Sequence, residues 1–160
     1  MDSETGQISF CHEAVGSGGD PTPRDRGNNH SGDVDMSEPI RVVPPDALVD
    51  ADPTPGVRRL RAIDAPGLWS GVAQTDPGAT SGWHHHGEHE TSLYVVSGAL
   101  RLEFGPGGEE VAEAGPGQFV HVPAHTIHRE SNPTGELAIV VIARAGNGAV
   151  TVNLDGPEGS

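Results

Sequence analysis

The stretch GATSGWHHHGEHETSLYVVSG, residues 78–98, decides how this sequence is interpreted. It carries three consecutive histidines just before a run of β-branched and apolar residues that ends at Gly98. Successive side chains of a strand point to opposite faces, so His84 and His86 share one face, about 7 Å apart, while His85 points away. Two neutral imidazoles on one face can bind the same divalent ion.

Outside this stretch, the chain reads as short strands between turns. The 160 residues include 23 Gly and 14 Pro, and no window between them is long enough for a helix bundle. Short β-branched runs that are separated by Gly and Pro predict an all-β sandwich or barrel. We expect a helical turn at 45–49 and a strand buried on both faces at 136–143. The other strands are expected near 57–64, 68–75, 80–86, 91–97, 99–104, 109–113, 118–122, 126–131 and 148–154.

Residues 1–36 differ in composition from the rest of the chain. Acidic residues outnumber basic ones seven to two there, and apolar residues follow no period. Such a composition buries too little apolar surface to fold, so we predict a disordered acidic tail and one folded domain at 37–160. Because patterned sequence begins directly after Met36, we expect the biological start of the protein at that residue.

Charge and cysteine content exclude several classes of function. All nine basic residues are Arg, which excludes Schiff-base lysine and P-loop chemistry. The net charge is -14, and the largest basic cluster is the short run 58–61, so no nucleic-acid partner is expected. Cys11 alone cannot form an internal disulfide, and no apolar run suits a membrane span or a signal peptide. We therefore predict a cytoplasmic protein without a membrane partner.

Seven of the nine histidines lie within residues 84–128. A purification tag would lie at a terminus, whereas this cluster is internal. A third imidazole added to His84 and His86 would leave coordination positions open for water or substrate. Open sites of this kind are typical of catalytic metal centres, while structural zinc sites are closed, usually by cysteines.

The spacing Gly78-x5-His84-x-His86-x4-Thr91-x6-Gly98 resembles the first motif of the cupin family. A glutamate normally stands in that motif where this chain has Thr91. The resemblance implies a single-domain jelly-roll β-barrel with a metal ion in its mouth, in agreement with the expected strands.

A second stretch strengthens this resemblance. Gly115 followed by Pro123-x4-His128-x3-Asn132 is similar to the second cupin motif. Its histidine supplies the remaining metal ligand in the family, which implies that role for His128. The two motifs together cover residues 78–132.

The departure at Thr91 leaves two models of the site. In the first, His84, His86 and His128 form a neutral shell, and Thr91 is a hydrogen-bonding neighbour inside the pocket. In the second, a bulge around residues 87–89 re-aims Glu90, which stands one residue before the aligned position, so that it becomes a fourth ligand. We favour the first model because the spacing to the flanking glycines is kept when Thr91 is the aligned residue.

The resemblance also implies a range of activities. Cupins with three-histidine sites include iron-dependent dioxygenases, so we predict an Fe(II) oxygenase of a small molecule, in which Thr91 or His121 handles protons. His121 either orients a ligand or lies on the outer face. Imidazoles also suit Zn(II), Ni(II) and Mn(II). The alternatives are a metal-assisted isomerase, lyase or hydrolase and a non-catalytic binding protein. A homodimer that pairs through residues 41–60 is expected by resemblance.

Overall fold

The computed structural model describes residues 39–54 and 56–158, and its regular elements are almost all strands. Two single turns of 3-10 helix, η1 (Pro45–Ala47) and η2 (Pro106–Gly108), are the helical elements of this part of the chain. None of the described residues forms a helix of the length and hydrophobicity that a membrane span requires. The strands are β1 (Val49–Thr54), β2 (Val57–Ala65), β3 (Leu68–Thr75), β4 (Trp83–His85), β5 (Glu90–Ser97), β6 (Leu100–Phe104), β7 (Glu110–Ala114), β8 (Phe119–Val122), β9 (His128–Ser131), β10 (Ala138–Ala145) and β11 (Val152–Leu154).

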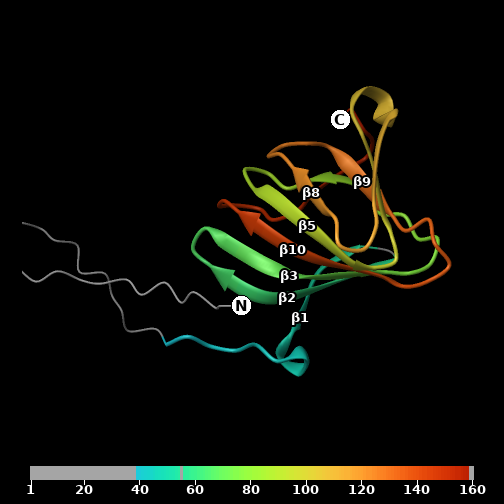
Figure 1. Cartoon of the computed structure of the whole chain (residues 1–160). Helices are drawn as coiled ribbons and strands as arrows, with labels where there is room; N and C mark the ends of the chain where they lie inside the picture. Colours follow the sequence, from blue (N-terminus) through green and yellow to red (C-terminus); the bar gives the residue numbers. More distant parts are fainter. Residues whose placement is uncertain (1–38, 55, 159–160) are drawn as a thin grey trace, which may run out of the picture. The chain divides into compact units, whose positions relative to one another are not determined.

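These strands form two antiparallel sheets. The six-stranded sheet has the order β1-β2-β3-β10-β5-β8 and the five-stranded sheet the order β11-β4-β9-β6-β7. Figure 1 shows β2, β3, β10 and β5 side by side in one layer. The all-β jelly-roll prediction is confirmed, and every expected strand is present. Strand β1 was not among the expected strands, because Asp and Pro, which are uncommon in strands, make up half of its sequence, VDADPT. The predicted tail, residues 1–36, lies outside the described residues.

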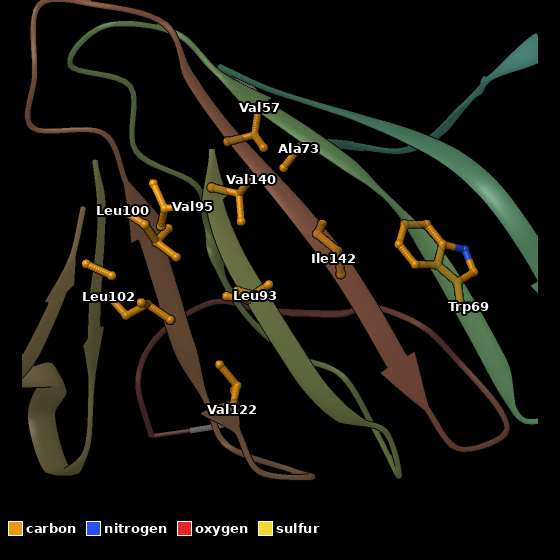
Figure 2. Close-up of a cluster of buried hydrophobic side chains, with 11 residues drawn as sticks. Val57, Trp69, Ala73, Leu93, Val95, Leu100, Leu102, Val122, Val140 and Ile142 are labelled. Carbon is orange, nitrogen blue, oxygen red and sulfur yellow. The ribbon is translucent and has the colours of Figure 1, made fainter. Parts of the chain in front are cut away.

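The core fills the space between the two sheets (Figure 2). It is built from the inward-facing residues of several strands, among them Leu93, Val95, Leu102, Val140 and Ile142. The expectation that residues 136–143 are buried on both faces is wrong. Burial alternates along β10, so the side chain of every second residue reaches the outer face, where antiparallel sheets commonly meet solvent.

At one end of the barrel the inward faces of β5 and β10 change from apolar to polar. Leu93 and Ile142 are paired in the β5–β10 register, and the next inward pair along the strands is Thr91 and Arg144. Both polar residues are fully buried. A polar lining inside a barrel requires partners or a function, so this end is where a site is expected.

Several motif residues have structural roles. Gly98 has a φ of +71°, and a Cβ on it would lie 2.7 Å from the Cα of Ala138. The side-chain amide of Asn132 donates to the carbonyls of Thr75 and Glu136, and the Asn132 carbonyl accepts from the backbone N–H of Gly78. The bond between Asn132 and Gly78 links the two motifs, so these glycine and asparagine residues hold the backbone that carries the histidines.

Candidate metal centre

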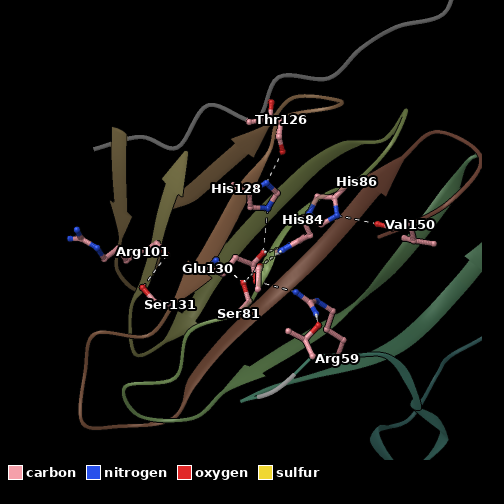
Figure 3. Close-up of polar contacts among 12 residues, drawn as sticks. Arg59, Ser81, His84, His86, Arg101, Thr126, His128, Glu130, Ser131 and Val150 are labelled. Atoms are coloured by element: carbon pink, nitrogen blue, oxygen red, sulfur yellow. Dashed lines mark hydrogen bonds and ion pairs between the residues drawn. The ribbon is translucent and has the colours of Figure 1, made fainter. Parts of the chain in front are cut away.

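Three histidines from two neighbouring strands converge inside the barrel (Figure 3). His84 in β4 is paired directly with His128 in β9, and His86 follows the end of β4. Their ring centroids are 4.5 Å apart for His84 and His128, 5.1 Å for His84 and His86, and 5.0 Å for His86 and His128. All three are about 1% exposed. The inward parity expected for His84 and His86 is what brings these rings together.

Backbone carbonyls determine which ring nitrogen of each histidine is free. The Nδ1 atoms of His84, His86 and His128 lie 3.0, 3.0 and 2.8 Å from the carbonyl oxygens of Gly82, Val150 and Thr126, respectively. A carbonyl can only accept, so each Nδ1 carries the proton and each Nε2 presents a lone pair. In metal sites, a hydrogen bond from the ring nitrogen that does not bind the ion is what orients each histidine ligand.

The environment also keeps two of these imidazoles neutral. Burial lowers the pKa of His84 to about 4, although the charge of Glu130 opposes this shift. Burial, with the positive charge of Arg144 as the next cause, lowers the pKa of His86 to about 2. At neutral pH both side chains are therefore unprotonated, as metal ligands must be.

Glu130, two residues after His128 in β9, adds a carboxylate to the cluster. Its Oε1 lies 3.9 Å from His84 Nε2 and 3.8 Å from His128 Nε2, while its Oε2 lies 3.4 Å from Nη2 of the buried Arg59. Arg59 also donates to Thr54 Oγ1 at 2.5 Å. Burial acts to raise the pKa of Glu130, but His128 and the charge of Arg59 outweigh it and hold that pKa well below the usual range. Glu130 is therefore ionised.

These four side chains fit a divalent metal ion. Their ligand atoms lie within 4.8 Å of one another. The Nε2 atoms of the three histidines are buried, and among the described residues none has a hydrogen-bond partner. Buried polar atoms without partners are unfavourable, and an ion bound between them would satisfy all three at once. The cluster of His84, His86, His128 and Glu130 thus indicates a metal site, referred to below as the metal centre.

Glu90, the alternative fourth ligand, lies elsewhere. Its side chain is 55% exposed on the outer face of β5, where Oε2 is 2.6 Å from His121 Nε2 and Oε1 accepts weakly from the Ala124 N–H. The bond with His121 is the main cause that lowers the pKa of Glu90. The pairing of β5 is regular around Glu90, and the irregularity in its register with β10 lies at the other end, between Val95 and Ser97. Strand parity therefore keeps Glu90 away from the metal centre, where Glu130 supplies the carboxylate instead.

The two residues expected to handle protons are separated by the barrel wall. His121 is 67% exposed and paired with Glu90, so of its two expected positions it takes the outer face, and the expectation that it handles protons at the metal is wrong. Thr91 is fully buried, and its Oγ1 has no hydrogen-bond partner among the described residues. Of the two, only Thr91 faces the interior.

The sequence interpretation missed Glu130, Arg59 and Arg144. A signal for Glu130 was present, because a residue two positions from His128 in a strand shares its face. Arg144 likewise continues the inward series of Val140 and Ile142 along β10. For Arg59 the signal was weaker: it lies two positions after the buried Val57 in β2, but Leu60 is buried as well, so the alternation breaks at this point.

Comparisons with known proteins agree with this fold. The sequence model of the family described as "Cupin domain" matches residues 71–143. Residues 71–143 form a cupin domain. No curated protein matches the chain in sequence.

Solved structures share the fold of this cupin domain at low sequence identity. KdgF from Halomonas sp. is 23% identical, with a TM-score of 0.56 over 68% of this chain and 96% of its own. A Klebsiella pneumoniae protein with a double-stranded β-helix domain is 20% identical, with a TM-score of 0.59 over 72% and 97%. Oxalate decarboxylase from Bacillus subtilis is 20% identical, with a TM-score of 0.56 over 64% of this chain and 28% of its own.

Proposed function

We propose that this cupin domain is an Fe(II)-dependent oxygenase of a small molecule. The observation that carries the proposal is the convergence of three unprotonated Nε2 atoms from His84, His86 and His128, with Glu130 as a fourth donor. Three imidazoles and one carboxylate leave positions open on an ion that prefers six ligands, as non-heme iron sites that react with oxygen require. Bound Fe(II) supplies the electrons for oxygen chemistry.

The residues of the chain have distinct roles in this proposal. The three histidines and Glu130 hold the ion, and the Nδ1 contacts with backbone carbonyls keep the rings aimed inward. Burial of all four side chains excludes bulk water from the reaction site. Thr91, whose hydroxyl faces the interior, is the residue best placed to hydrogen-bond a substrate.

Metal analysis combined with oxygen uptake tests this function. Protein purified without added metal should contain about one iron per chain, and a screen of small molecules should identify one that stimulates oxygen consumption. Zn(II)-loaded protein serves as the control, since it keeps the site but cannot reduce oxygen. Stoichiometric iron without oxygen uptake on any substrate would count against the oxygenase function.

A second candidate is a cupin that binds a metal or a small molecule without turnover. A cupin that uses a non-redox ion in an isomerase or lyase reaction is a further alternative. Both are favoured by the position of His121 on the outer face, which leaves Thr91 as the only residue of the expected proton-handling pair in the interior. Ligand binding to the metal-loaded protein without any product formation would support the binding protein.

We also propose a homodimer. Strand β1 lies at an edge of the six-stranded sheet, and the segment that precedes it carries the exposed apolar side chains of Ile40 and Val42. Unpaired edges and exposed apolar residues of this kind favour association. Sedimentation of the wild-type protein and of Ile40→Asp/Val42→Asp should give a dimer and a monomer, respectively; a wild-type monomer would contradict the proposal.

A further inference from the structure

A hollow of about 300 Å³ lies between two loops of the domain. Part of its lining comes from the turn between β2 and β3, and part from the start of the connection between β10 and β11. The backbone N–H of Gly146 donates to the carbonyl of Gly67 at 3.2 Å and joins these two loops. None of the four residues of the metal centre is among the described residues that line the hollow, so a ligand here would be distinct from one bound by the ion.

Two buried rings, Trp69 in β3 and His89 just before β5, belong to the lining. Each is 4% exposed, whereas Leu68 and Asn147, which line the hollow from the two loops, are exposed. Figure 2 shows Trp69 at one end of the core, beyond Ile142. The two rings therefore form the inner end of the hollow, and the loops form its rim.

His89 supplies a hydrogen-bond acceptor to this inner end. Its Nδ1 lies 2.9 Å from the carbonyl oxygen of His86, which can only accept, so Nδ1 carries the proton and Nε2 of the neutral ring presents a lone pair. Within the described part of the chain this Nε2 has no hydrogen-bond partner. Unlike the Nε2 atoms of the metal centre, it is not completely buried, so it is open to a ligand in the hollow.

Trp69 supplies a hydrogen-bond donor. Arg144 lies over the face of the ring, 4.8 Å from its centroid, which leaves the edge that carries Nε1–H. Among the described residues Nε1 has no hydrogen-bond partner, and it is not completely buried either. The indole N–H of a buried tryptophan usually has a partner, so this donor also indicates a ligand.

One donor and one acceptor at the same end of a hollow restrict the chemistry of its occupant. A hydroxyl group both donates and accepts, so an alcohol matches His89 Nε2 and Trp69 Nε1–H alike. A carboxylate can only accept and would leave Nε2 of the neutral imidazole facing another acceptor. An ammonium group can only donate and would meet the indole N–H. Either ion would also lose hydration without full replacement, which is unfavourable.

We infer that this hollow binds a small neutral alcohol, whose hydroxyl group donates to His89 Nε2 and accepts from Trp69 Nε1–H. The apolar part of the alcohol would lie against Pro66, Leu68 and Val150, which also line the hollow. This binding site is separate from the proposed oxygenase function, because it requires neither a metal ion nor turnover.

The indole N–H signals of the full chain test this site directly. The chain has two tryptophans, so its ¹H–¹⁵N spectrum should contain two indole signals, and Trp83→Phe identifies which belongs to Trp69. Benzyl alcohol, added at pH 8 where ordinary imidazoles are neutral, should shift the Trp69 signal with a dissociation constant of about 1 mM and leave the Trp83 signal in place. A Trp69 signal that does not move well above this concentration would overturn the inference.

Matched probes with the same ring test the required chemistry. Benzyl methyl ether accepts but cannot donate, so it should bind about 3- to 10-fold more weakly than the alcohol. Benzoate and the benzylammonium ion should each bind at least about tenfold more weakly, since each leaves one partner unsatisfied and is a charged group. An ether as strong as the alcohol would exclude His89 as the acceptor, and tighter binding of either ion would exclude a site for neutral alcohols.

Variants assign the two hydrogen bonds by calorimetric titration. His89→Asn keeps an amide that can donate to the His86 carbonyl but has no Nε2, so it should weaken the alcohol about 3- to 10-fold and leave the ether unchanged. Trp69→Phe removes the donor and should weaken both probes by a similar factor. His121→Asn and Trp83→Phe are the matched controls and should bind like wild type. Wild-type affinity for the alcohol in both His89→Asn and Trp69→Phe would refute the site.

Two further measurements complete the test. Metal-free and Zn(II)-loaded protein should both bind benzyl alcohol, so binding without metal supports this site even where the oxygenase function fails. Thermal unfolding shows whether each variant keeps its fold, because Trp69 also packs against Arg144. If Trp69→Phe is unfolded, the comparison of alcohol and ether in wild type and His89→Asn still decides.

Discussion

Glu130 connects Arg59 to the histidines: one carboxylate oxygen lies 3.4 Å from the guanidinium, and the other lies 3.8 Å from His128 Nε2. The carboxylate therefore interacts with Arg59 on β2 and would also interact with the ion that the histidines hold. Buried ion pairs depend on both members, because a charge left alone in the interior is strongly destabilising. Stability and metal binding are thus linked at this residue.

Replacement of Glu130 should affect both properties. Glu130→Gln is expected to lower the free energy of unfolding by about 3 kcal/mol, since Arg59 loses its countercharge. It should also weaken metal binding, measured by competition with a chromophoric chelator. Glu90→Gln, at the exposed carboxylate paired with His121, is the control and should bind metal like wild type. If Glu90→Gln weakened metal binding more than Glu130→Gln did, Glu90 would be the ligand.

Replacement of both members of the pair separates the two effects. In Arg59→Met/Glu130→Leu neither member of the pair is left as an unpaired charge, so most of the lost stability should return while metal affinity stays low. Urea denaturation and chelator competition on the same samples provide the comparison. Full recovery of metal affinity in this variant would show that Glu130 acts only as the partner of Arg59.

Loss of a single histidine should remove the metal. His128→Ala is expected to weaken metal binding by more than the roughly 10- to 100-fold that the loss of an outer hydrogen-bond partner causes. His121→Ala removes an imidazole that is 67% exposed on the outer face and should leave metal content unchanged. Elemental analysis after dialysis decides, and metal retained by a His84→Ala/His128→Ala double variant would refute the metal centre itself.

The metal-free protein should become less stable as the pH falls. Histidines of the unfolded chain bind protons below pH 6.5, whereas in the fold the pKa is about 4 for His84 and about 2 for His86. The unfolded state therefore holds more protons in this window, and stability rises with pH. Between pH 7 and pH 5 each of these histidines should account for about 2 kcal/mol.

Urea titrations at several pH values measure this slope. His84→Gln removes one of the two contributions, so its slope between pH 7 and pH 5 should be about half that of wild type. Glu130, whose pKa is also lowered by folding, adds a loss of the same sign below pH 4.5. A stability that is constant from pH 7 to pH 5 would contradict the neutral, buried state of the histidines.

Two glycines with similar backbone angles should respond differently to alanine. Gly78 and Gly98 have φ values of +69° and +71°, but a Cβ on Gly78 has no atom within 4 Å, while one on Gly98 meets Ala138 at 2.7 Å. Gly78→Ala should cost about 1 kcal/mol for the left-handed backbone alone. Gly98→Ala should cost about 1–3 kcal/mol more from the clash. Thermal unfolding of both variants measures the difference, and equal losses would argue against the close approach.

Local patterns were sufficient to predict the fold and the histidines, but only part of the site. Strand parity placed His84 and His86 on one face, and the spacing of the second motif indicated His128. The same parity argument, applied to the residue two positions after His128, would have indicated Glu130. Attention was drawn to Glu90 because the family places its carboxylate in the first motif, whereas this chain carries one in the second.

The buried arginines required the three-dimensional arrangement. Arg59 is stabilised inside the barrel by Glu130, which lies 71 positions away in the sequence, and Arg144 by the ring of Trp69. Periodicity within one strand cannot reveal such partners. A charged residue at an inward position was therefore the least predictable feature of the site.

The carbonyl of Val150 that holds His86 belongs to the connection between β10 and β11, and so to the crossing from one sheet to the other. An ion bound by the three rings would link that connection, through His86, to the histidines of β4 and β9. Release of the ion and loosening of residues 146–151 would then be one event. Amide hydrogen exchange in this connection would accordingly report metal occupancy at a distance from the ligands themselves.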